Sequence, residues 1–183
     1  MSIANINKLF YLILSLSLFL GLYFGEDSAG SGGFRLDFST TWPLVENPFR
    51  SDLTIYDIKF PLHYYIASAA YFVLNDKNYL RFFYCLIALL SQYIFYACLK
   101  KKFIETDKNN LFFFSLIIFM LPSVRSAAIW PNTQITAILF FLISTYFFLT
   151  WESKKNYNNF SKDLFFTILF MSLTVYTRQI YAM

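Results

Sequence analysis

Long apolar stretches recur along this chain, and each is separated from the next by a short polar or basic segment. Two of them, residues 79–99 and 132–151, reach the roughly 20 apolar residues that a helix needs to cross a hydrocarbon core. A water-soluble domain of 183 residues could not bury so much apolar surface, because its surface-to-volume ratio is too high. Only 14% of the residues are charged, against roughly 25% in soluble proteins. We therefore expect an all-α integral membrane protein that crosses the bilayer several times.

The apolar stretches fit a single transmembrane domain over residues 1–183, with about five spans. We expect the spans near residues 9–25, 79–99, 109–125, 132–151 and 164–183. A polar outer loop at 26–60 contains aromatic residues that recur at helical spacings of three and four. Pro43 and Pro48 interrupt this spacing, so the loop is predicted to contain one or two short interfacial helices.

The lysines indicate how these segments cross the membrane. Residues 61–74 would form a helix that rises roughly 21 Å, which is too short for a hydrocarbon core about 30 Å thick. If this helix does not cross and stays on the outer side, every lysine cluster faces the cytoplasm, as the positive-inside rule prefers. These lysines are Lys8, Lys100–Lys102, Lys108, Lys154, Lys155 and Lys162. The net charge of +4 thus reflects membrane topology, and no nucleic-acid partner is expected.

The two ends of the chain leave alternatives open. Ser28 and Gly30 offer a small-residue cleavage site after the first apolar run, yet the length of that run favours a retained anchor over a signal peptide. Met183 ends the chain within an apolar segment that has no polar flank, which favours an N-terminal fragment. The rich use of Phe, Lys, Asn and Ile is typical of an AT-rich coding sequence. We therefore expect a multi-pass protein of a bacterial inner (plasma) membrane.

Three carboxylates near the first span are the catalytic candidates. Glu26 and Asp27 follow that span directly, and Asp37 lies ten residues beyond Asp27. A carboxylate at the outer surface can act as a general base towards a hydroxyl group, or can hold a divalent cation against a lipid phosphate. A divalent cation is thus the only cofactor suggested, and the metal requirement stays open. Alternatively, these acidic residues only begin a solvated loop.

Lys59 and His63 flank Pro61, where a helix is predicted to begin because proline suits the first helical turn. The free amides and the dipole at that helix start would attract an anion, with Lys59 and His63 beside it. An aromatic belt at headgroup depth, including His63, is an equally good interpretation.

Two arginines are further candidates for substrate binding. Arg125 follows Pro122 close to the predicted outer leaflet, where it could bind a lipid phosphate or extend its side chain to the interface. Arg178 is predicted roughly 21 Å into the last apolar segment, where a charge is costly unless it faces protein or a polar cavity. Alternatively, Arg178 marks the end of a shorter span.

The order of these features resembles that of a known enzyme class. The segment Phe60-Pro61-Leu62-His63-Tyr64-Tyr65 follows a span that ends in acidic residues and a loop with short helices. A span closed by Lys100–Lys102 and a proline-containing turn from Leu121 to Asn132 come next. The chain thus resembles the multi-spanning glycosyltransferases of the C superfamily, which includes protein O-mannosyltransferases, bacterial aminoarabinose transferases and Rgt-like sugar transferases. The family usually has a second proline where Phe60 stands, and often an Asp near Asn132.

The resemblance implies roles for some of these residues. A carboxylate at Glu26 or Asp27 would activate the acceptor or position a metal. Basic residues such as Arg35, Arg125 or Arg178 would neutralise the departing polyprenyl phosphate. The implied partners are membrane lipid, a polyprenyl-phosphate sugar and a glycan or lipid acceptor.

The leading hypothesis is therefore a hexosyl- or pentosyltransferase that moves a sugar from a polyprenyl-phosphate donor to a lipid or polysaccharide acceptor at the outer membrane face. The alternative is a non-catalytic component of membrane transport or of polysaccharide assembly and export, which predicts polar residues along the middle of several spans. The spans consist mainly of Phe, Leu, Ile and Tyr, and polarity is concentrated in the outer loop, which favours a surface site. A third possibility is an inert fragment whose active remainder is missing.

Overall fold

The computed structural model describes residues 3–27, 33–49, 62–154 and 161–178, and these residues form helices and no strands. The all-α prediction is thus confirmed for the described part of the chain. The helices are α1 (Ile3–Phe24), α2 (Gly33–Glu46), α3 (Leu62–Leu74), α4 (Lys77–Lys102), α5 (Lys108–Phe119), α6 (Pro122–Ile129), α7 (Thr133–Ser153) and α8 (Lys162–Thr177).

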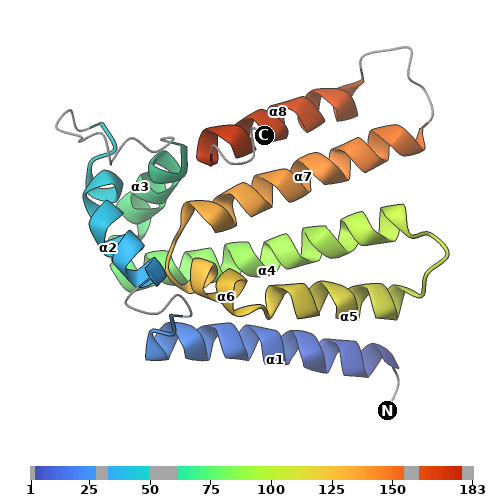
Figure 1. Ribbon diagram of the computed structural model, residues 1–183, viewed down its shortest axis with the longest axis horizontal. Coiled ribbons are helices and arrows are strands. Elements are labelled where there is room, and N and C mark those ends of the chain that lie inside the picture. The colour runs from blue at the N-terminus through green and yellow to red at the C-terminus, as the bar shows by residue number, and fades with distance from the viewer. Residues whose placement is uncertain (1–2, 28–32, 50–61, 155–160, 179–183) are drawn as a thin grey trace.

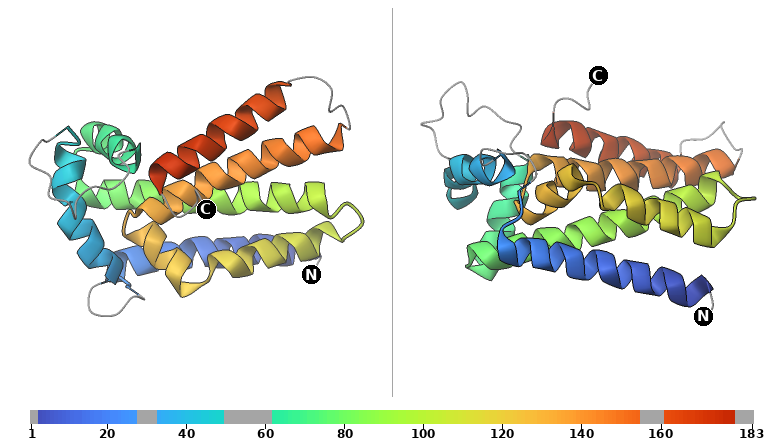
Figure 2. Two further views of the ribbon diagram at one scale, coloured as in Figure 1. Left: turned by 45° about the horizontal axis from the view of Figure 1, so that its top comes forward. Right: turned by 60° about the horizontal axis from the view of Figure 1, so that its bottom comes forward.

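Five of these helices (α1, α4, α5, α7 and α8) lie side by side, whereas α2 and α3 lie across one end of them (Figures 1 and 2). One end of the bundle carries α2, α3, α6 and residues 25–27, which follow α1, and is called the carboxylate end. The opposite end, called the lysine end, carries the described lysines of the predicted cytoplasmic face: Lys8, Lys100–Lys102, Lys108, Lys154 and Lys162. Lys77, at the start of α4, lies at the carboxylate end.

In the described residues, α1 (over Ile6–Phe24), α4 and α7 are long and apolar enough to cross a membrane. An exposed apolar stripe lies on α1, where Leu12, Leu16 and Leu20 are 53%, 52% and 56% exposed. A soluble monomer rarely exposes a continuous apolar patch of this kind. These helices are consistent with a membrane protein.

The predicted span near 109–125 is not one continuous helix. α5 ends at Phe119, and α6 begins at Pro122 after a bend of 69° between the two helix axes. Pro122 has no N–H to continue the hydrogen bonding of α5, but it suits the first turn of a new helix. The pair would make a fourth span if it crosses as a unit. The bend directs α6 towards the end of α1 and so brings Arg125 to the carboxylate end.

Two other helices differ in extent from the sequence prediction. α2 runs through Pro43 to Glu46, so the expected interruption at Pro43 is wrong. The proline costs α2 one internal hydrogen bond, but the helix also packs through buried Trp42, Leu44 and Val45. α8 has 16 residues and ends at Thr177, so it is shorter than the predicted span at 164–183.

α3 and α4 are joined by a tight turn. Asn75 adopts a left-handed conformation (φ 51°), and Asp76 caps α4 by accepting from the backbone N–H groups of Asn78 and Tyr79 at 2.7 and 3.1 Å. Asparagine tolerates the left-handed conformation because its short polar side chain can form local hydrogen bonds, and aspartate is a preferred helix N-cap because its carboxylate accepts from free backbone N–H groups. The turn keeps α3, which has 13 residues, against the start of α4 at the carboxylate end.

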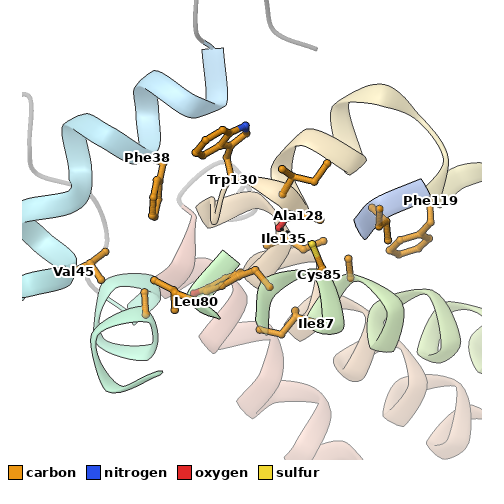
Figure 3. Close-up of a cluster of buried hydrophobic side chains, with 14 of the residues drawn as sticks. Phe38, Val45, Leu80, Cys85, Ile87, Phe119, Ala128, Trp130 and Ile135 are labelled. Carbon is orange, nitrogen blue, oxygen red and sulfur yellow. Dashed lines mark hydrogen bonds between the residues drawn. The ribbon is translucent and has the colours of Figure 1, made fainter. Parts of the chain in front are cut away.

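The buried core gathers where α4 meets α6 and α7, close to the carboxylate end (Figure 3). Leu80 and Cys85 on α4 are fully buried, as are Ile129 on α6 and Ile135 on α7. Phe38 of α2 and Trp130 close the cluster from the side, with ring centroids 6.1 Å apart. The polar groups at this end are thus supported by the best-packed part of the molecule.

Candidate functional site

The end of α1 positions Glu26. Gly25 adopts a left-handed conformation (φ +65°), which glycine tolerates because it has no Cβ atom. The backbone N–H of Glu26 then donates to the carbonyl of Gly21 at 2.9 Å, the bond that closes a Schellman helix end. A Cβ atom on Gly21 would lie 2.6 Å from Oε2 of Glu26. The two glycines therefore let the Glu26 carboxylate fold back over the last turn of α1.

Arg125 of α6 binds this carboxylate through both of its oxygens. Its Nη2 lies 2.5 Å from Oε2 of Glu26, and its Nε donates to Oε1 at 3.2 Å. The guanidinium also donates to the side-chain and backbone oxygens of Ser17 on α1. Only 15% of the Arg125 side chain is exposed, so it points into the protein. The described contacts leave Glu26 as a structural partner of Arg125 rather than an open base.

Trp130, directly after α6, lies beside this ion pair. Its indole N–H donates to the backbone carbonyl of Glu26 at 2.9 Å. The guanidinium carbon of Arg81 lies 3.7 Å from the centroid of the Trp130 ring, and that of Arg35 lies at 5.7 Å. Two cations thus share one aromatic ring, an arrangement that the negative face of indole stabilises.

Arg81 is buried on the first turns of α4 and was not among the predicted site residues. Its Nε donates to the carbonyl of Ile129 at 3.0 Å, and its Nη2 donates to the carbonyl of Leu22 at 3.2 Å. These carbonyls belong to the last turns of α6 and α1, where backbone carbonyls lack the full set of partners found inside a helix. The sequence held one signal for Arg81, since an arginine inside a predicted span is expected to have a specific partner, although its partners cannot be named from the sequence.

Asp27, Arg35 and Asp37 lie around the start of α2. The backbone N–H of Arg35 donates to Oδ2 of Asp27 at 3.1 Å, so this carboxylate lies at the positive end of the helix dipole. Asp37 is exposed and accepts from Nδ2 of Asn132 at 3.4 Å. Asn132 in turn caps α7 by accepting from the N–H of Gln134 at 3.1 Å. The predicted candidates Asp27, Arg35 and Asp37 are thus brought together.

His63 lies in a buried polar cluster of its own. It is only 2% exposed, and its Nδ1 lies 2.8 Å from Oγ1 of Thr136 and 3.4 Å from the hydroxyl of Tyr84. The predicted anion site at the start of this helix therefore does not include an exposed His63. Lys59 and Pro61 lie outside the described residues.

Arg178 is the first residue after α8, in agreement with the alternative that it marks the end of a shorter helix. With the amide of Gln134 oriented so that its oxygen faces Arg178, that oxygen accepts from Nη1 at 2.6 Å and from Nη2 at 3.2 Å. The first turn of α7 therefore contacts three predicted site residues, because Asn132, Gln134 and Thr136 bind Asp37, Arg178 and His63 in turn.

Within the described ranges, no group of three or more His, Cys, Asp or Glu side chains is placed to hold a metal ion. The carboxylates could bind a divalent cation only together with ligands from a substrate or water. Comparisons with protein-family models, curated proteins and solved structures find no match to this chain.

Proposed function

We propose that this chain is a membrane glycosyltransferase that moves a sugar from a polyprenyl-phosphate donor to a lipid or polysaccharide acceptor. One observation carries the proposal: three arginines and three carboxylates lie near Trp130, at one end of an apolar helix bundle. The arginines are Arg35, Arg81 and Arg125, and the carboxylates are those of Glu26, Asp27 and Asp37. A lipid-linked sugar phosphate needs cations for its phosphate and a carboxylate for the acceptor, close to the edge of the membrane.

The arginines would have different roles. Arg125 and Arg81 are tied to Glu26 and to backbone carbonyls, so they hold the framework of the site. Arg35 is exposed, and its guanidinium lies over Trp130. Arg35 is therefore the arginine that can reach a phosphate oxygen with charge-assisted hydrogen bonds.

Asp37 is the best-placed candidate for the general base. It is exposed, and its carboxylate accepts only a long hydrogen bond from Asn132, at 3.4 Å, among the described residues. In the proposed step, Asp37 takes the proton of the acceptor hydroxyl while the acceptor oxygen bonds to the anomeric carbon. The bond from that carbon to the phosphate oxygen breaks, and the electron pair leaves with the polyprenyl phosphate, beside Arg35.

The proposed topology has about five crossings. α1, α4, α7, α8 and the bent pair of α5 and α6 cross, whereas α3 stays at the carboxylate end. The lysine end would then face the cytoplasm of a bacterial cell, and the carboxylate end would face outwards.

The transport or export alternative requires a polar path through the bundle. Polar side chains are buried between the helices, but they bond to neighbours within the bundle: Gln92 donates to Ser115 at 2.7 Å, and Ser144 donates to the carbonyl of Thr167 at 2.8 Å. This pattern supports helix packing more than a conduit.

The proposal is tested with membranes that contain the chain and a panel of polyprenyl-phosphate hexoses and pentoses radiolabelled in the sugar. Transfer of label to lipid or polysaccharide, with release of polyprenyl phosphate, is expected for one donor. Asp37→Asn should lower that rate at least about 100-fold, as expected for loss of a general base. Asp163→Asn, which removes a carboxylate at the lysine end, should leave the rate unchanged. Absence of transfer from every donor, or equal rates for Asp37→Asn and the unmodified chain, would contradict the proposal.

A further inference from the structure

A second polar feature lies at the lysine end, remote from the site described above. A groove of about 400 Å³ between α4 and α7 is lined by Tyr93, Ile94, Ala97, Lys100, Ile143 and Tyr146. From Tyr93 to Lys100 the groove extends roughly 10 Å along α4. Its walls are apolar or aromatic, and Ala97 leaves space between the larger side chains.

Two lysines lie at one end of this groove: Lys100 lines it, and Lys101 contacts the ring of a lining residue. Nζ of Lys100 lies 4.5 Å from the ring centroid of Tyr96, and Nζ of Lys101 lies 4.7 Å from that of Tyr146, which lines the groove. Other lysines nearby have acidic partners, since Lys102 pairs with Glu152 and Lys154 pairs with Asp163. Among the residues that the structure describes, no carboxylate forms an ion pair with Lys100 or Lys101.

We propose that this groove binds one anionic phospholipid, with its phosphate between Lys100 and Lys101 and the start of an acyl chain against Ala97 and Ile143. The charge at the groove is positive, so an anionic headgroup is complementary to it, and a zwitterionic one is less so. The hydroxyl groups of Tyr93 and Tyr146 can donate to the phosphate or glycerol oxygens. Basic pockets between membrane helices recognise anionic headgroups by this combination of cations and apolar walls.

The proposal depends on both the charge and the shape of the groove, and the two can be separated by substitution. Lys100→Gln with Lys101→Gln removes the cations and leaves the walls. Ala97→Phe fills the groove and leaves the charge, and Ile143→Phe does so from the facing helix. Lys108→Gln is the matched control, because it removes one lysine at the same end that does not line the groove.

The test is native mass spectrometry of the purified full chain released from micelles that contain equal amounts of dioleoylphosphatidylglycerol and dioleoylphosphatidylcholine. The first bound lipid should be mainly phosphatidylglycerol, with a preference of about fivefold for each lysine. The double lysine variant and either groove-filling variant should bring the ratio of bound phosphatidylglycerol to phosphatidylcholine towards one, whereas Lys108→Gln should retain the preference. Circular dichroism checks that each variant is folded. Equal binding of the two lipids by the unmodified chain would overturn the proposal. An unchanged preference in both folded groove-filling variants would also overturn it, because surface charge alone would then explain the binding.

Discussion

Arg125 binds both carboxylate oxygens of Glu26, a residue 99 positions earlier in the chain. The pair joins the end of α1 to α6, and it is oriented by the left-handed Gly25 on one side and by the bend at Pro122 on the other. The carboxylate end therefore joins segments that are distant in sequence. Single substitutions can measure how much each of its residues contributes to the stability of the protein.

Glu26→Gln should lower the free energy of unfolding by roughly 2 kcal/mol, because Arg125 would keep its partly buried charge and lose its charged acceptor. Titration with SDS in mixed micelles, followed by circular dichroism, measures this change. Glu152→Gln is the control, since Glu152 and its partner Lys102 are 43% and 57% exposed and such pairs contribute about 1 kcal/mol or less. Equal losses of unfolding free energy for the two variants would show that the Glu26–Arg125 pair stabilises the protein no more than an exposed ion pair does.

Gly25→Ala should destabilise the chain by about 1 kcal/mol, because a Cβ atom disfavours the left-handed conformation. The new methyl group itself has room, as its nearest described neighbour beyond the flanking residues is Trp130 at 3.7 Å. The midpoint of thermal unfolding in detergent would report the loss. Gly25→Asn should have a smaller effect, because asparagine tolerates this conformation better; a larger loss for Asn than for Ala would contradict the argument.

Arg81→Lys should destabilise the chain by roughly 1–3 kcal/mol, because a lysine cannot stack a planar cation on Trp130 and also donate in two fixed directions. Urea unfolding in detergent, monitored by Trp fluorescence, measures the effect. The matched control is Lys77→Gln, which removes a cation that lies 4.1 Å from the ring centroid of Trp42. That loss should be about 1 kcal/mol or less. If Arg81→Lys leaves the stability unchanged, the two hydrogen bonds from Arg81 to backbone carbonyls are dispensable.

Single cysteines at Ser39 and Ser153 test which end of the bundle faces outwards. Both positions are exposed, Ser39 on α2 and Ser153 at the end of α7. With Cys85 and Cys98 replaced by alanine, a membrane-impermeant maleimide applied to intact cells should label position 39 alone. Labelling of position 153 alone would place the carboxylates in the cytoplasm and contradict the proposed use of an outward-facing lipid-linked donor.

The helical architecture was predictable because apolar length decides it. Residues 79–99 were predicted as a span and lie within α4, and residues 132–151 were predicted as a span and match α7 with its N-cap Asn132. The span predicted near 109–125 is broken at Pro122, whose missing N–H acts locally, whereas Pro43 did not break α2, because packing of the helix outweighed the lost bond.

The site was predictable in its composition but not in its pairing. Acidic residues after an apolar run could be recognised, and so could Arg125 after a proline. That Glu26 would turn back to Arg125 depends on the conformation of Gly25 and on the 69° bend, neither of which follows from residue type. Arg81 was missed because it lies inside an apolar run, and its partners are backbone carbonyls, which leave no trace in a sequence.

The position of Arg81 has a consequence for the order in which the protein assembles. The guanidinium of Arg81 on α4 donates to the carbonyls of Leu22 and Ile129, so α4 joins the last turns of α1 and α6. When α1 leaves the ribosome, Arg81 does not yet exist, and Ile129 is made 48 residues after Arg81. The hydrogen bonds from Arg81 that join α1 to α6 can therefore form only after α6 has been made.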